Sequence, residues 1–132
     1  MREIQVTTER RTQLLDITAG VREALGSDAE GSAALVYVPH TTAGVVINEK
    51  IDPDLLSDFE MALEEIVDDG WSWKHVDADG PNAPSHVRAS VVGPQVLVPL
   101  RDGDLALGTY QGIFFCEFDG PRTRSVYLAT LS

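Results

Sequence analysis

The chain of 132 residues has the length of one domain, and its 43% hydrophobic and 23% charged residues are ordinary for a globular protein, which excludes disordered and fibrous classes. Ten lysines and arginines against 21 acidic residues give a formal net charge of −11, which would repel a phosphate backbone and argues against nucleic-acid partners. There is no apolar stretch of about 18 residues and no signal-peptide core, so we expect no membrane partner and a cytoplasmic location. The single cysteine, Cys116, lies in an apolar run and is expected to be a buried thiol.

Two strands and a short helix are predicted at the start of the chain. Apolar and polar residues alternate over residues 3–8, and a second strand pattern follows at residues 13–17. We expect these two strands to pair antiparallel. Thr18 is expected to cap a helix over residues 19–25, which Gly26 ends.

Two apolar runs, residues 32–38 and 43–47, come next. They predict either two buried strands joined by residues 39–42 or one long strand with a bulge there. In both interpretations His40 lies at the end of a strand.

A longer helix is predicted after Asp52-Pro53, because an aspartate cap followed by proline at the first helical position is a helix start. Apolar residues then recur at helical spacing as far as Gly70. Residues 71–85 have no periodicity and contain Gly80, Pro81 and Pro84, which predicts an irregular loop long enough to be functional.

The last third of the chain is predicted to be mainly strands. A short helix over residues 86–92 closes at Gly93-Pro94, and Arg101-Asp102-Gly103 forms a tight turn. The expected strands cover residues 95–100, 105–110, 112–118 and 124–131.

The three histidines, His40, His75 and His86, all lie in or beside loops at the ends of apolar segments. Neutral imidazole binds zinc and also transfers protons near neutral pH, so a clustered set could serve either purpose. Their spacing matches none of the short zinc signatures, and exposed loop histidines would show the same pattern.

Other polar residues stand at strand ends. Glu49, after Asn48, could act as a general base or orient a histidine, or it could be a surface glutamate. The turn at residues 108–112 and Arg122 could approach an anion closely, although a strand bulge or turn and an ordinary surface arginine are the commoner explanations of such patterns. Turn residues 79–82 offer Asn82 as a substrate contact.

Five segments together resemble the YjbQ family and follow the family's order along the chain. They are residues 39–45 (Pro-His-Thr-Thr-Ala-Gly-Val), Asn48-Glu49, residues 82–90, residues 107–113 and residues 115–122. The sequence departs from the family pattern at Pro81, which stands between the glycine and the asparagine of the loop.

The resemblance implies one α+β domain over residues 1–132, with a mixed or antiparallel β-sheet sandwich and two to three helices, assembled as a homotrimer with sites near subunit contacts. Family members are labelled secondary thiamine-phosphate synthases. Carried over to this sequence, the catalytic set is His40, Glu49, His75 and His86, and the same three histidines form a metal set for which zinc is favoured. The implied substrate-binding residues are Thr42, Asn48, Asn82, Arg88, Thr109, Gln111, Glu117 and Arg122.

The leading hypothesis is therefore an enzyme acting on a small phosphorylated or anionic metabolite, with thiamine-phosphate synthase-like transferase activity and a histidine-rich, metal-binding site. One alternative is a metal-assisted hydrolase in which Glu49 takes a proton from metal-bound water. Another is a trimer that binds a metabolite or metal without catalysis.

Overall fold

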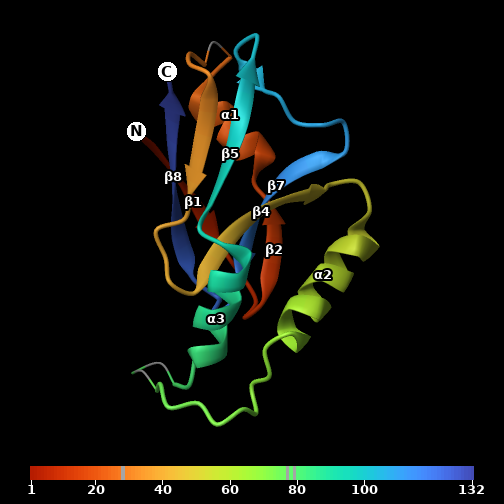
Figure 1. The fold of residues 1–132 in the computed structure, drawn as a ribbon, viewed down its shortest axis with the longest axis vertical. Helices are drawn as coiled ribbons and strands as arrows, with labels where there is room; N and C mark the ends of the chain where they lie inside the picture. The colour runs from red at the N-terminus through yellow and green to blue at the C-terminus, as the bar shows by residue number, and fades with distance from the viewer. Residues whose placement is uncertain (28, 77, 79) are drawn as a thin grey trace.

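Residues 1–27, 29–76, 78 and 80–132 are described by the computed structural model, in which they form eight strands and three helices (Figure 1). The helices are α1 (Thr18–Leu25), α2 (Pro53–Glu65) and α3 (Ala83–Val92). The strands are β1 (Arg2–Thr7), β2 (Gln13–Asp16), β3 (Ala33–Tyr37), β4 (Ala43–Glu49), β5 (Gln95–Arg101), β6 (Asp104–Leu105), β7 (Gln111–Glu117) and β8 (Thr123–Leu131). This α+β content confirms the predicted fold class.

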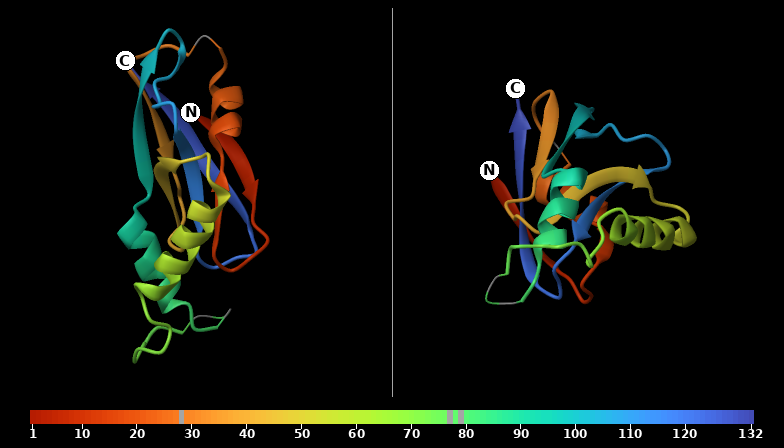
Figure 2. Two further views of the ribbon diagram at one scale, coloured as in Figure 1. Left: turned by 90° about the vertical axis from the view of Figure 1, so that its right-hand side faces the viewer. Right: turned by 60° about the horizontal axis from the view of Figure 1, so that its bottom comes forward.

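The strands form two antiparallel sheets. The larger has the order β1-β8-β3-β5-β6 and the smaller the order β2-β7-β4. Their inner faces share one apolar core, in which Val36, Val126 and Leu128 of the larger sheet pack with Val45 and Phe115 of the smaller. Helices α2 and α3 lie on the outer side of the smaller sheet (Figure 2).

Strand β7 is buried on both faces because it lies between the larger sheet and the helices. Phe115 faces the core between the sheets, whereas Cys116 and Phe118 pack with Ala89 of α3 in a second apolar cluster. Burial raises the pKa of the Cys116 thiol to about 12, so it stays protonated and unreactive, as the apolar run predicts.

The predicted pairing of the first two strands is wrong. Strand β1 pairs with β8 in the larger sheet, and β2 pairs with β7 in the smaller sheet. Each strand has one apolar face that the two-residue period reveals, but the choice of partner depends on contacts far along the chain. For the same reason residues 39–42 join two strands in different sheets, not two halves of one bulged strand.

Several element boundaries also differ from the predictions. Thr18 is the first residue of α1 and not its cap, because its hydroxyl donates to Asp16 and accepts from the amide of Ile113. Helix α2 ends at Glu65, before Gly70, and α3 begins at Ala83, so His86 lies inside the helix. Of the strand expected at residues 105–110, only Leu105 lies in a strand, the two-residue β6 (Asp104–Leu105).

Other local predictions are confirmed. Asp52 caps α2, since its carboxylate accepts from the amide of Asp54 at 2.9 Å. Gly26 follows α1 at a φ of 80°, and Asp102 and Gly103 adopt the positive φ values of a tight hairpin turn. Of the turn expected at residues 79–82, Asp79 lies outside the described residues. No helix among the described residues combines the length and the apolarity that crossing a bilayer requires.

Candidate functional site

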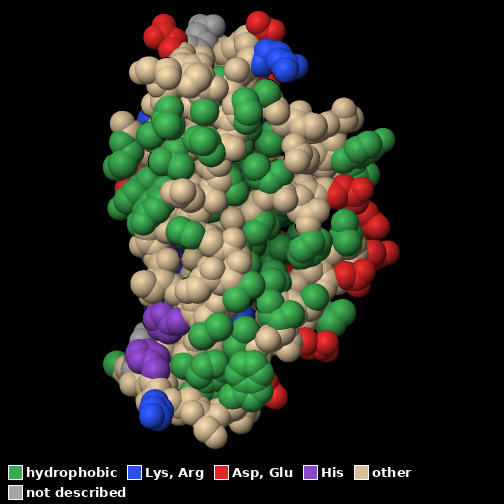
Figure 3. Space-filling model, in the orientation of Figure 1, with side chains coloured by type: hydrophobic (Ala, Val, Ile, Leu, Met, Phe, Trp, Pro, Cys, Tyr) green, Lys and Arg blue, Asp and Glu red, His purple; other side chains and the backbone are tan. Residues whose placement is uncertain are grey.

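A polar pocket of about 330 Å3 opens at the end of the sandwich where the β3–β4 connection, the start of α3 and the β7–β8 connection meet. Its lining residues are Pro39, His40, Thr41, Thr42, Asn82, His86, Asp119, Arg122 and Arg124. A second hollow of about 340 Å3 continues it past His40 and His86 along α3. Figure 3 shows histidine side chains gathered at this end of the molecule.

His40 is fixed by a backbone amide. Its Nε2 accepts a hydrogen bond of 3.0 Å from the amide N–H of Ser125 in β8. Burial lowers the pKa of His40, and the nearby charges of Arg124 and Arg122 lower it further. Because Nε2 must be unprotonated to accept, the neutral ring carries its proton on Nδ1.

His75 and His86 contact each other edge to face, with ring centroids 5.0 Å apart. His86 comes from the first part of α3 and His75 from the loop before it. Nε2 of His86 is buried and has no hydrogen-bond partner within the described residues. A buried imidazole nitrogen without a partner is costly unless a ligand, a metal ion or water completes it.

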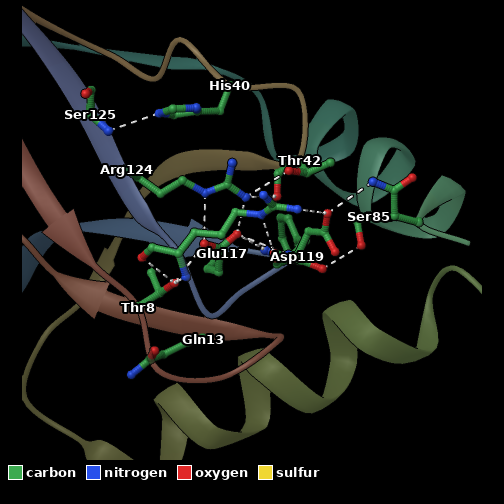
Figure 4. Close-up of polar contacts among 12 residues, drawn as sticks. Thr8, Gln13, His40, Thr42, Ser85, Glu117, Asp119, Arg124 and Ser125 are labelled. Carbon is green, nitrogen blue, oxygen red and sulfur yellow. Dashed lines mark hydrogen bonds and ion pairs between the residues drawn. The ribbon is translucent and has the colours of Figure 1, made fainter. Parts of the chain in front are cut away.

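A buried ion pair lies beneath the pocket (Figure 4). Glu117, at the end of β7, is fully buried and accepts from both Nε and Nη2 of Arg124 in β8. Its carboxylate also accepts from the Thr8 hydroxyl at 2.8 Å and from the amides of Phe118 and Asp119 at 3.1 Å. Five hydrogen bonds therefore satisfy this buried carboxylate, which anchors Arg124 and is too deep to contact a ligand itself.

A second ion pair forms the pocket wall. Asp119 Oδ2 accepts from Arg122 Nη2 at 3.0 Å and from Asn82 Nδ2 at 3.1 Å. Arg122 Nε also donates to the Asp119 carbonyl at 2.8 Å. Asp119 thus ties the start of α3 to the β7–β8 connection and holds Arg122 at the pocket.

Four of the predicted site residues lie elsewhere. Asn48, Glu49, Thr109 and Gln111 are at the opposite end of the β4–β7 pair, where Glu49 is directly paired with Gln111. Six residue steps along β4, from Ala43 to Glu49, span about 20 Å. Within one chain the structure therefore does not bring Glu49 together with the histidines.

Arg88 does not line the pocket either. This α3 residue is only 1% exposed and donates to the carbonyls of Leu63, Glu64 and Val67, at and just beyond the end of α2. The carbonyls of Leu63 and Glu64 belong to the last turn of α2, where they have no partner within the helix, so Arg88 completes the end of α2 and holds it against α3. The guanidinium of Arg88, expected to bind substrate, is thus used to hold α2, and Arg88 is not among the residues that line the pocket.

Sequence reasoning missed two charged groups of the pocket, Arg124 and Asp119. The burial of Arg124 could have been predicted from the sequence, because the two-residue period of β8 places it on the same inward face as Val126 and Leu128, both buried. An arginine at an inward strand position needs a buried partner, which here is Glu117. Asp119 gave no such signal, since its sequence context is that of a turn.

The metal set of three histidines is not assembled as expected, because no group of three or more His, Cys, Asp or Glu side chains among the described residues is arranged to hold an ion. The pair of His75 and His86 does fit part of such a site. Two imidazoles bound to one tetrahedral zinc ion have ring centres about 5 Å apart. The observed separation of 5.0 Å and the partnerless Nε2 of His86 are compatible with that arrangement.

The fold and the pocket together define a two-sheet α+β domain with a polar, histidine-containing pocket at one end of the sandwich. The chain belongs to the family described as UPF0047 protein YjbQ-like, whose model matches residues 2–132. It is 42% identical to UPF0047 protein YugU of Bacillus subtilis over 132 residues, covering 97% of this chain and 96% of YugU. A solved structure of a hypothetical protein from Aeropyrum pernix is similar, with a TM-score of 0.90, 40% identity and coverage of 99% of this chain and 97% of that chain.

Proposed function

We propose that the protein is a cytoplasmic enzyme that acts on a small phosphorylated or anionic metabolite, with thiamine-phosphate synthase-like transferase activity. The observation that carries the proposal is the composition of the pocket. In a chain with a net charge of −11, two arginines and two histidines line one hollow of about 330 Å3 together with a single carboxylate, Asp119. Such a concentration of donors suits the oxygens of a phosphate or carboxylate.

The family resemblance suggests the reaction, in which a pyrimidine carbinyl diphosphate is joined to a thiazole phosphate. A carbon–nitrogen bond forms and pyrophosphate leaves, so negative charge on the departing group must be stabilised. Arg122 and Arg124 are the guanidinium groups of this pocket, and each can donate a charged hydrogen bond to it. The described groups that could hold a zinc ion are His75 and His86. When bound there, such an ion would supply charge neutralisation as a Lewis acid.

The test is to incubate the purified protein with the two substrates, with and without Zn²⁺ or Mg²⁺, and to measure thiamine phosphate by mass spectrometry. We expect product from wild type and a loss of at least about 100-fold in kcat/KM for Arg122→Ala, because a transition-state donor is removed. An Arg101→Ala variant, at an exposed hairpin end away from the pocket, is the matched control. Absence of product from wild type would reject the transferase activity.

The same samples distinguish the alternatives. Release of phosphate with incorporation of oxygen from labelled water would indicate a hydrolase, although Glu49 lies too far from the histidines of its own chain to be the base. Tight binding without turnover would indicate a non-catalytic binding protein.

The proposal includes the homotrimer that the resemblance implies. The outer face of the larger sheet carries exposed apolar side chains, with Tyr37 39%, Leu97 58% and Leu131 42% exposed. Their strands are neighbours in the sheet, and Figure 3 shows hydrophobic side chains gathered over this region. A continuous apolar face of this kind is typical of a subunit contact.

We expect wild type to elute as a trimer and Leu97→Glu as a smaller species, since a charge buried at the contact would be unpaired. Light scattering coupled to size exclusion gives the mass directly. Glu23→Gln, on the exposed side of α1, serves as the control. A wild-type protein that is monomeric at micromolar concentration would contradict the trimer.

A further inference from the structure

Arg124 uses only part of its guanidinium to hold the fold. Nε and Nη2 are engaged by Glu117, and Nη2 also donates to the Thr42 hydroxyl at 2.8 Å. Nη1 makes no hydrogen bond within the described part of the chain, although Arg124 lines the pocket. Figure 4 shows this nitrogen pointing away from Glu117, on the side where His40 lies.

Two further donors line the same pocket as that nitrogen. The Thr42 hydroxyl accepts from Arg124, so its own O–H proton is left to donate. Nε2 of neutral His40 uses its lone pair to accept from the Ser125 amide, so the ring proton is on Nδ1 and this N–H can donate. All three side chains line the same pocket.

We infer that Nη1 of Arg124, the Thr42 hydroxyl and Nδ1–H of His40 form an oxyanion-binding subsite, with Glu117 and the Ser125 amide as its positioning groups. The subsite takes one phosphoryl or carboxylate group of the substrate, because each of its three groups has a proton to donate and neither Nη1 nor Nδ1–H can accept. The inference rests on the proposed function and specifies how the anionic group is held.

The subsite is expected to distinguish anions by the arrangement of their acceptor oxygens more than by their charge. Glu117 offsets the charge of Arg124, so the attraction for a simple ion such as chloride is weak. An oxyanion with several acceptor oxygens instead receives directed hydrogen bonds from donors that are already fixed. Nη1 is held in place through the two other guanidinium nitrogens, which is the rigidity that such a site needs.

The first experiment measures the binding of inorganic phosphate and of pyrophosphate by titration calorimetry, in chloride buffer with and without Zn²⁺. Arg124→Lys keeps a positive charge for Glu117 but has a single nitrogen, which cannot also reach the pocket. We expect Arg124→Lys to bind phosphate and pyrophosphate at least about tenfold more weakly than wild type does. Arg101→Lys, the matched control away from the pocket, is expected to bind as wild type does.

A second pair of variants decides the matter if Arg124→Lys does not fold. Thr42→Val removes the hydroxyl with little change in shape, whereas Thr42→Ser keeps it. We expect weakened binding in the first and rescue in the second, with equal circular dichroism spectra.

The outcomes separate the two proposals. Unchanged affinity in Arg124→Lys, or equally weak binding in Thr42→Val and Thr42→Ser, overturns the subsite while the anionic pocket of the proposed function survives. A wild-type protein that binds neither probe, with or without zinc, overturns the anionic pocket and the subsite together.

Discussion

Replacing Glu117 by alanine is expected to lower the free energy of unfolding by about 3–5 kcal/mol, because it leaves the Arg124 guanidinium buried without its counter-ion. Glu117 is fully buried and joins the end of β7 to β8 and to Thr8, so the loss falls where the two sheets meet. Urea unfolding followed by fluorescence, at one fixed protein concentration, gives the difference.

Two variants show whether the effect comes from the unpaired charge. Glu117→Gln keeps an acceptor oxygen and the side-chain shape, so its loss should be smaller than that of alanine. The double variant Glu117→Leu with Arg124→Met removes both charges and should recover part of the stability. A loss under about 1 kcal/mol in Glu117→Ala would mean that water reaches Arg124 and that the pair is not a structural anchor.

Faces of strands were predictable from the sequence, whereas partners of strands were not. The two-residue period of β8 identifies Val126 and Leu128 as core residues, and the unbroken apolar run of β7 identifies a strand covered on both sides. The pairing of β1 with β8 joins residues more than a hundred positions apart. No local pattern encodes such a contact, so the prediction chose the neighbouring strand instead.

Some residues of the candidate site were likewise predictable from the sequence, and others were not. His40, Thr42, Asn82 and His86 line one pocket because the ends of different elements converge at one end of the sandwich. Glu49 is close to His40 in sequence but not in space, because the extended strand β4 separates them. Arg88, two residues after His86, lies on the buried side of α3, since successive helix positions point in different directions.

Replacing the three histidines one at a time is expected to lower the affinity for zinc by different amounts. The difference shows which histidines are metal ligands. His75→Ala and His86→Ala should each weaken zinc binding at least about 100-fold, because removing a direct ligand costs more than removing a supporting group. His40→Ala should change it by less than about tenfold, since its only lone pair already accepts from the Ser125 amide. Zinc competition against a chelating dye measures all three variants and wild type.

Each possible result of the zinc measurement assigns a role to the three histidines. If His40→Ala loses as much affinity as the other two variants, His40 releases the Ser125 amide to bind the ion, and the three-histidine set predicted from the sequence is restored. If wild type does not bind zinc, His75 and His86 act as proton-transfer or hydrogen-bonding groups, and the buried Nε2 of His86 must meet substrate or water instead. If only His75 and His86 are required, the pocket has a metal side on α3 and the preceding loop and a donor side on β8, with the substrate held between them.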